Sequence, residues 1–310
     1  MDLSWVQLRV IIINMFEQGF LLTFLAFGVL MTFRFFRFPD LTAEASYPLG
    51  GTVVATLLVL KVNPFWAIGI AVLAGVVAGV ITSLIHTKLR INPIIAGIIT
   101  LTATYSIMLR IMGRSNIPLL RITTVYEVIL APVERFLGYP LVQTGRSIGI
   151  IIFLGVLLLI IALLFYWFLR TDLGLAVRAT GENPHMISGL GVNTDTTKLI
   201  GVAISNGLIA LSGALVAQDH GFADVQMGVG VLVAGAAAVL IGQSIFGDRT
   251  AGWWIVASIT GILIYRLLVG LALRAGLAPT DLRLITAVLL LLALAVPQWR
   301  AILLNRREAG

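Results

Sequence analysis

The chain has 310 residues, of which 59% are hydrophobic and only 11% are charged, with a formal net charge of +7. A soluble domain carries about 25% charged residues, so this composition excludes an ordinary soluble enzyme or binding module. Lysine and arginine stand mostly at the ends of apolar blocks, where they meet lipid headgroups, and this placement excludes nucleic-acid binding.

Apolar blocks recur along the chain at lengths near those needed to cross a hydrocarbon core of ~30 Å. In chain order the predicted crossings are residues 10–33, 48–60, 64–85, 92–112, 147–169, 199–217, 231–246, 251–273 and 284–304. The second and the seventh are short, so we expect broken helices there. The sequence therefore predicts an all-α polytopic transmembrane helical bundle of about nine spans, forming one domain over residues 1–310.

Two of these blocks differ in the size of their side chains. Residues 199–217 are rich in Gly, Ala and Ser, which let helices approach closely, so this block is predicted to lie in the bundle interior. Residues 147–169 are almost purely aliphatic and are predicted to face lipid. We therefore expect leucine to be harmful at Gly207 and Gly213, whereas changes at Ile151, Ile152 and Leu158 should be mild.

The intervals between the blocks also carry patterns. The longest interval without a crossing covers residues 113–146, and within it residues 125–137 are amphipathic and are expected to lie on the outer surface. An irregular stretch with an aspartate precedes a short small-residue block twice, at Asp40 and at Asp224. Paired segments of this kind often bracket a transport path, so the pattern hints at two related halves.

Residues 171–197 form a polar-leaning interval between two long apolar blocks. Leu173, Leu175 and Val177 can line one face of a short helix there, and Gly181 and Pro184 interrupt it. Considered without any relatives, the residues favour a connector whose charges face water over a segment that transmits movement, because charged helical faces are common.

Three stretches share motifs with one known family. The first reads Gly174-x-Ala176-x-Arg178-Ala179-x-Gly181-x-Asn183, followed by Gly189-Leu-Gly-Val192. The second is 38–51, with Asp-Leu-Thr near its start, and the third is the small-residue stretch 205–214. In this order they resemble the coupling segment, the early Asp-Leu-Ser/Thr…Gly motif and the small-residue helix of ABC-importer permeases of the branched-chain amino acid and ribose type. One departure is Pro184-His185-Met186, where that family usually has small residues.

The resemblance implies a permease subunit of a bacterial ATP-driven importer, multi-pass in the inner membrane, with its N-terminus outside. It implies a cytoplasmic ABC ATPase subunit, an extracytoplasmic solute-binding protein and a second permease copy as partners, with a homodimer favoured. The Phe-Pro-Asp-Leu-Thr variant is similar to a branch associated with aromatic amino acid uptake, so an amino acid is the expected small-molecule substrate, ahead of sugars and nucleosides. Coupling to the ATPase is expected at Arg178, Ala179, Thr180, Gly181, Glu182, Asn183 and Pro184.

Polar side chains inside or beside the apolar blocks are candidates for the translocation path. A buried polar group without a partner is costly in hydrocarbon, so each one needs protein, water or solute as a partner. A wet path and simple hydrogen bonding between helices would both meet this need. The candidates for the path are Asp40, Glu44, Thr102, Tyr105, Asn206 and Gln243.

The sequence shows no catalytic chemistry of its own. It lacks a Gly-x4-Gly-Lys-Ser/Thr phosphate loop, it has no cysteine, and its three histidines are far apart. We therefore expect no enzyme activity, no cofactor and no metal site, with ATP hydrolysis in a separate subunit. The alternative is a secondary transporter that uses intramembrane carboxylates. The candidates for that role are Glu17, Asp40, Glu44 and Asp224, which mostly stand at block edges and so favour ATP-driven import.

Overall fold

The computed structural model describes residues 5–36, 38–137, 143–247, 250–278, 281–282 and 284–291. Its two short strands pair antiparallel, with Asn116 opposite Asp224. The prediction of an all-α bundle is confirmed, since every other element of the described chain is a helix. The elements are α1 (Trp5–Leu30), the π-helix η1 (Met31–Phe35), α2 (Ala43–Val59), α3 (Pro64–Leu89), α4 (Pro93–Met112), β1 (Asn116–Pro118), α5 (Val125–Leu137), α6 (Gln143–Arg170), α7 (Asp172–Glu182), α8 (Pro184–Gly189), α9 (Thr194–His220), β2 (Phe222–Asp224), α10 (Val231–Phe246) and α11 (Ala251–Arg274).

Within the described part of the chain, six helices are long and apolar enough to cross a membrane. They are α1 continued into η1, α3, α4, α6, α9 and α11. The helices at the second and seventh predicted blocks, α2 and α10, have only 17 and 16 residues, as expected for broken helices. The ninth predicted block lies largely outside the described residues. The multi-span bundle is therefore confirmed, and the count of nine crossings is not.

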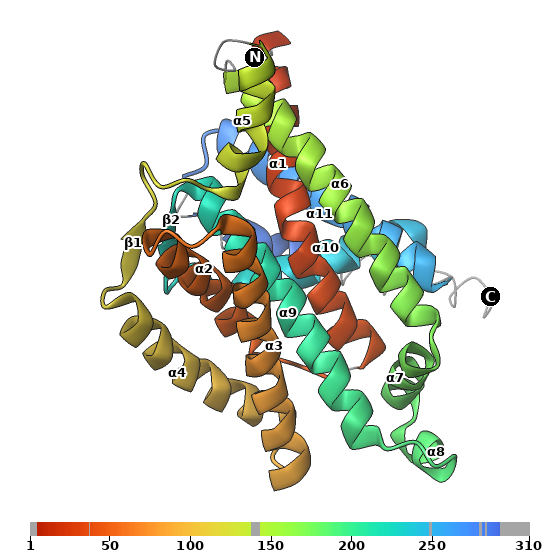
Figure 1. Cartoon of the computed structure of the whole chain (residues 1–310). Helices are drawn as coiled ribbons and strands as arrows, with labels where there is room; N and C mark the ends of the chain where they lie inside the picture. Colours follow the sequence, from red (N-terminus) through yellow and green to blue (C-terminus); the bar gives the residue numbers. More distant parts are fainter. Residues whose placement is uncertain are drawn as a thin grey trace, which may run out of the picture.

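Helix α9 lies at the centre of the bundle, with α1, α2 and α3 packed against it (Figure 1). Of its most apolar 18-residue window, 78% is buried. Small residues make this packing possible, because Gly75 of α3 lies against the main chain of Asn206, and Gly213 of α9 lies against the carbonyl of Tyr47. The prediction that this block fills the interior is confirmed.

Helix α6 lies at the edge of the bundle and keeps only 28% of its corresponding window buried. Most of its surface is exposed on the outside of the bundle, as a helix that faces lipid would be, and Ile152 is 62% exposed. The prediction that it faces lipid was wrong for Leu158, which is buried. Leu154, Leu158 and Phe165 share the stripe of α6 that packs into the core, and Phe165 stacks on Phe27 of α1.

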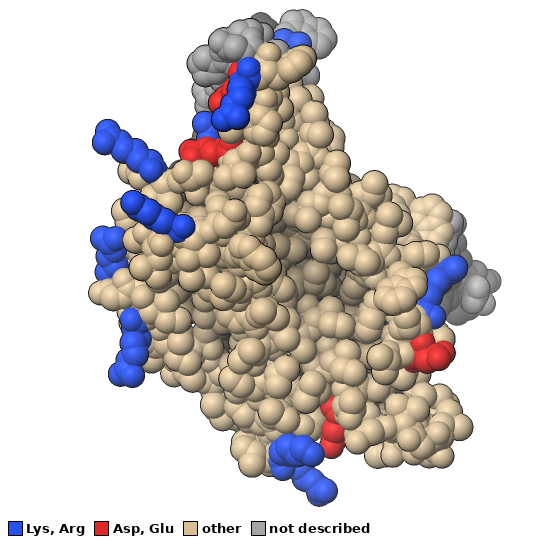
Figure 2. Space-filling model, in the orientation of Figure 1, with Lys and Arg blue, Asp and Glu red and all other residues tan. Residues whose placement is uncertain are grey.

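The two ends of the molecule differ in their elements. Figure 1 shows α5 and the start of α1 at one end, here called the α5 end, and α7 and α8 at the other, here called the α7 end. The predicted amphipathic helix is confirmed, since α5 covers Val125–Leu137 and buries Tyr126 and Leu130 while Phe136 is exposed. Figure 2 shows charged side chains gathered toward the ends and along the β1–α4 edge, which leaves a broad uncharged band between them.

Candidate functional site

The polar interval 171–197 folds into two short helices at the α7 end. The hydroxyl of Thr171 accepts a hydrogen bond from the Gly174 N–H at 3.2 Å and so caps the start of α7. The Asn183 side chain accepts one from the Met186 N–H at 3.1 Å and caps α8, whose first residue is Pro184. A turn with Gly191 at φ +85° then leads to α9. The predicted interruption at Pro184 is confirmed, whereas the one predicted at Gly181 was wrong, because α7 continues through Gly181 to Glu182.

The buried face of α7 is made of small residues. Val177 is fully buried, the Thr180 hydroxyl lies 2.9 Å from that of Thr197 on α9, and Gly181 lies directly against the carbonyl of Phe35 in η1. The predicted apolar face was wrong for Leu173 and Leu175, which are 54% and 48% exposed. Close main-chain contact with η1 needs small side chains on the docked face, so the two leucines point away.

The seven residues predicted to couple to an ATPase divide between two surfaces. Thr180 is buried, and Gly181, Ala179 and Arg178 are half-buried between α7 and the bundle. The Nε of Arg178 is buried and has no hydrogen-bond partner among the described residues. The remaining three residues lie at the junction of α7 and α8 and are exposed on the surface: Glu182, Asn183 and Pro184.

A buried polar network joins the irregular stretch before α2 to the centre of α9. Asp40 is fully buried, and its carboxylate accepts hydrogen bonds from the Asn206 side chain at 2.7 Å and from the Thr42 N–H at 2.9 Å. The Ser46 hydroxyl donates to the Asn206 side-chain oxygen at 2.6 Å. Burial raises the pKa of Asp40, while the hydrogen bonds from Thr42 and Asn206 oppose that rise. Asn206 is therefore held between α2 and α9 by protein partners.

Three buried threonine hydroxyls extend this network across the bundle. Thr42 lies 2.7 Å from the Thr82 hydroxyl of α3, which donates to Thr100 of α4 at 2.8 Å. The threonines also bond to helix carbonyls, as Thr100 does with Ala96 at 3.1 Å. The network thus ties α2, α3, α4 and α9 together near the middle of the molecule.

The remaining candidates for the path lie apart from this network. The Glu44 carboxylate accepts a hydrogen bond from the Gly230 N–H at 3.2 Å, at the start of α10. The Gln243 side-chain nitrogen is buried and lacks a partner among the described residues. Thr102 and Tyr105 are exposed on the outward face of α4, and the Thr102 hydroxyl donates to its own helix at Ile98. The structure therefore brings Asp40 and Asn206 together, but it does not bring all six candidates together.

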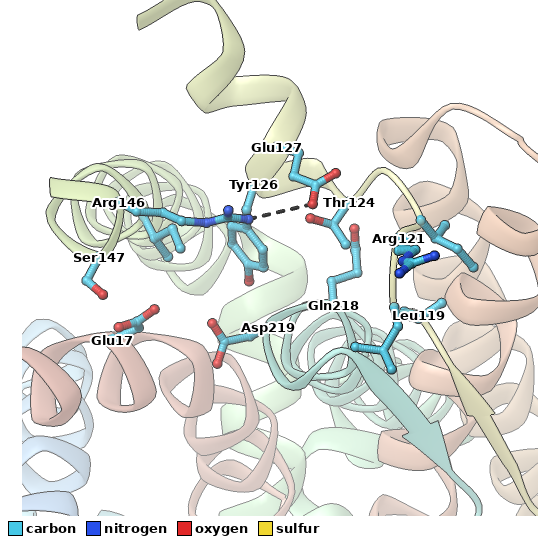
Figure 3. A pocket seen from close by; sticks show the side chains of 13 residues that line it. Glu17, Leu119, Arg121, Thr124, Tyr126, Glu127, Arg146, Ser147, Gln218 and Asp219 are labelled. Atoms are coloured by element: carbon cyan, nitrogen blue, oxygen red, sulfur yellow. Dashed lines mark ion pairs between the residues drawn. The ribbon is translucent and has the colours of Figure 1, made fainter. Parts of the chain in front are cut away.

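A pocket of about 330 Å³ lies between α1, α5, α6 and α9 at the α5 end (Figure 3). Figure 3 shows Glu17 and Asp219 pointing into it below Tyr126, while Arg146 reaches across to Glu127. Arg146 and Glu127 form an ion pair at 3.6 Å. The Tyr126 hydroxyl donates to the carbonyl of Leu215 on α9 at 3.1 Å, so it fixes α5 to the bundle.

Sequence reasoning missed Arg266, a charged residue in the middle of an otherwise apolar block. It lies near Gln18 of α1, whose side-chain nitrogen donates to Asp219 at 2.7 Å. The signal was present, because an ionisable residue inside a membrane span is rare and usually functional. The pairing with α1 could not be found from sequence, since the residues lie 248 positions apart.

Comparison with known proteins gives consistent matches over most of the chain. The family described as branched-chain amino acid transport system / permease component matches residues 11–295. The tyrosine transport system permease protein of Clostridioides difficile (strain R20291) is 38% identical over 284 residues, 92% of this chain and 90% of the relative. An uncharacterised protein of Rickettsia prowazekii (strain Madrid E) is 33% identical, over 92% of this chain and 97% of that one.

More distant similarities agree with these. The ribose import permease protein of Haemophilus influenzae is 27% identical over 228 residues, 72% of this chain and 67% of the relative. A chain of the solved structure of PsaBC from Streptococcus pneumoniae in complex with Fab is similar with a TM-score of 0.51 and 15% identity. It covers 90% of this chain and 89% of that one. At that identity the likeness shows the fold alone.

Proposed function

The chain belongs to the permease component family of branched-chain amino acid transport systems, and we propose that it takes up tyrosine or a closely related amino acid. It is a multi-pass permease of the inner membrane and a component of an ABC importer for a small solute. The observation that carries the substrate is the 38% identity to a tyrosine transport system permease over 92% of the chain. Sugars are the second candidate, because the ribose permease is also a relative.

The substrate is tested by uptake into proteoliposomes that hold the permease with its ATPase and solute-binding protein. We expect ATP-dependent uptake of L-tyrosine, with competition by unlabelled phenylalanine and none by ribose. Competition by ribose but not by phenylalanine would favour the sugar candidate instead. Uptake driven by an ion gradient without ATP would restore the secondary transporter, which the family membership sets aside.

The energy for transport is proposed to arrive through α7 and α8. The exposed junction of Glu182, Asn183 and Pro184 provides a surface for a cytoplasmic ATPase, while Gly181 and Thr180 connect α7 to η1 and α9. Under this proposal the α7 end faces the cytoplasm. The α5 end then faces outward, where a solute-binding protein would dock.

The path is proposed to run between two copies of the permease. Thr102, Tyr105 and Ser106 form a hydroxyl-bearing stripe on the exposed face of α4, at the spacing of one helix side. Such a stripe is unusual against lipid, whereas it suits a wet surface. Asp40 and Asn206, buried one layer behind α4, would support this surface, and Gln243 and Glu44 would lie deeper in each copy.

Cysteine substitutions test this placement in a chain that has no native cysteine. We expect Thr102→Cys and Tyr105→Cys to react with a small water-soluble thiol reagent at least about tenfold faster than Ile160→Cys, because only a hydrated thiol ionises. Ile160 is a matched control, since it is 49% exposed on the lipid-facing side of α6. Asn206→Cys should stay unreactive at rest. Equal, slow labelling at positions 102, 105 and 160 would place the stripe in lipid.

A further inference from the structure

A second pocket, of about 460 Å³, lies among α1, α2, α9, α10 and α11, and Leu282, Thr286 and Ala287, which follow α11, also line it. We call it the Arg266 pocket. Its volume is within the range of ~300–1,000 Å³ that is typical of small-molecule sites. His220, the last residue of α9, lines it, so the pocket lies toward the α5 end of the bundle.

The charged group of this pocket forms no ion pair within the described part of the chain, although the Asp219 carboxylate lies near enough to attract it. The Nε of Arg266 is buried and has no hydrogen-bond partner among the described residues. Its guanidinium makes a single long contact, to the Gln18 side-chain oxygen at 3.5 Å. The nearby carboxylate of Asp219 accepts a hydrogen bond from the Gln18 side-chain nitrogen at 2.7 Å, so Gln18 stands between this carboxylate and Arg266. A buried unpaired cation is costly, so it is expected to have an anionic partner in the working protein.

One side of the Arg266 pocket is electrically positive, and most of the remaining lining is apolar. The start of α10, with Gly230 at φ +80°, borders the pocket and adds the partial positive charge of a helix N-terminus. Glu44 already accepts the Gly230 N–H, so Arg266 remains the main site for a ligand anion. Apart from His220 and Thr286, whose hydroxyl is hydrogen-bonded to that of Tyr265, the rest of the lining is apolar or aromatic, including Leu22, Tyr47 and Val269.

These features match a ligand with one carboxylate and an apolar or aromatic body. We propose that Arg266 binds the α-carboxylate of the transported amino acid in this pocket, with the amino acid side chain against Tyr47 and Val269. The proposal rests on the proposed function, because it takes the substrate to be an amino acid such as tyrosine. It assigns a solute site to the permease itself, on the side where a solute-binding protein would release its cargo.

The role of Arg266 in binding can be separated from a role in folding. If the arginine is kept for a ligand, its neutral replacement removes an unpaired buried charge, and stability should stay equal or rise. We therefore expect Arg266→Gln and Arg266→Met to unfold at or above the wild-type midpoint in thermal melts. A lowered midpoint for both variants would mean that the arginine serves the fold, and would overturn the assignment.

The decisive measurement is binding of L-tyrosine to the assembled transporter in lipid nanodiscs without the solute-binding protein. We expect Arg266→Gln to weaken L-tyrosine binding at least about tenfold, because a buried charged partner of the carboxylate is lost. Arg266→Lys should recover part of the affinity. Tyramine, which lacks the carboxylate and is a cation, should bind Arg266→Gln no more weakly than wild type. Arg135→Gln, which removes an exposed arginine on α5, is the charge-matched control and should bind like wild type.

The outcomes separate this proposal from the proposed function. If the wild-type importer takes up L-tyrosine with ATP and Arg266→Gln binds it as tightly as wild type, the pocket assignment is wrong and the function stands. An equal loss of tyramine and L-tyrosine binding would also overturn carboxylate recognition. Absence of L-tyrosine uptake and binding by the wild-type importer would overturn the proposed substrate and this assignment together.

Discussion

Replacing Gly213 with leucine is expected to prevent stable folding of the permease. A Cβ at this position would overlap the main-chain carbonyl of Tyr47, so α2 and α9 would have to separate. The main chain of a helix cannot move aside as a side chain can. The loss in free energy of unfolding should therefore exceed the ~1–3 kcal/mol of ordinary overpacking. We expect thermal unfolding in detergent to begin roughly 10 °C lower or more, with little folded protein recovered.

Two other glycines provide matched controls for this result. Gly69 of α3 has nothing within 4 Å of its Cβ position, so Gly69→Leu should leave the unfolding midpoint unchanged. Gly207 of α9 faces the Val76 side chain, 2.8 Å from its Cβ position, with Val72 farther off at 3.7 Å, so Gly207→Leu should be intermediate. Equal midpoints for all three variants would show that α9 is not packed as described.

Reversing the charge of Glu182 is expected to separate ATP hydrolysis from uptake. The side chain is exposed at the end of α7, so Glu182→Lys should insert and unfold like wild type. A charge reversal at a docking surface weakens the contact, and we expect ATP-dependent uptake to fall at least about tenfold. Uptake and ATPase activity are measured in the same proteoliposomes. Normal uptake by this variant would exclude the junction of α7 and α8 as the docking site.

Gly181 is a poorer probe of the same proposal than Glu182. A bulky residue there would alter the predicted coupling segment, but it would not alter coupling alone. The structure places Gly181 against the Phe35 carbonyl, so Gly181→Leu would also displace α7 from η1. We therefore expect this variant to lose stability and uptake together. Exposed Leu175→Ala is a suitable control on α7, because it removes bulk without touching η1.

The sequence predicted those features that depend on local pattern. The 3.6-residue periodicity marked α5, and the small residues of 199–217 marked the central helix α9. Features that depend on the packing of distant segments were not predictable in this way. Nothing local in the chain shows that Asn206 meets Asp40, 166 positions earlier, or that Leu158 faces the core while Ile152 faces outward.

In the candidate site, too, local pattern was predictable from the sequence and the packing of distant segments was not. The interval 171–197 was located by its polarity and its motif, but its docked face was misjudged, because close packing selected Gly181 and Val177 over the larger leucines. Arg266 was overlooked because a single charge hardly changes the hydropathy of a 24-residue helix. Its importance became visible only when its buried Nε proved to lack a partner.

The contact between Gly181 and Phe35 also bears on how such a permease could diverge over evolution. Main chain meets main chain there, and Phe35 is in turn packed between Phe165 and Trp254, so this joint leaves little room for variation. The outer surface of α8 has no such constraint, since Pro184, His185 and Met186 are all exposed. The departure from the resembled motif, noted in the sequence, falls on those three residues. If the proposed docking holds, substitutions on this outer face could adapt the permease to a different ATPase while the joint beneath it stays the same.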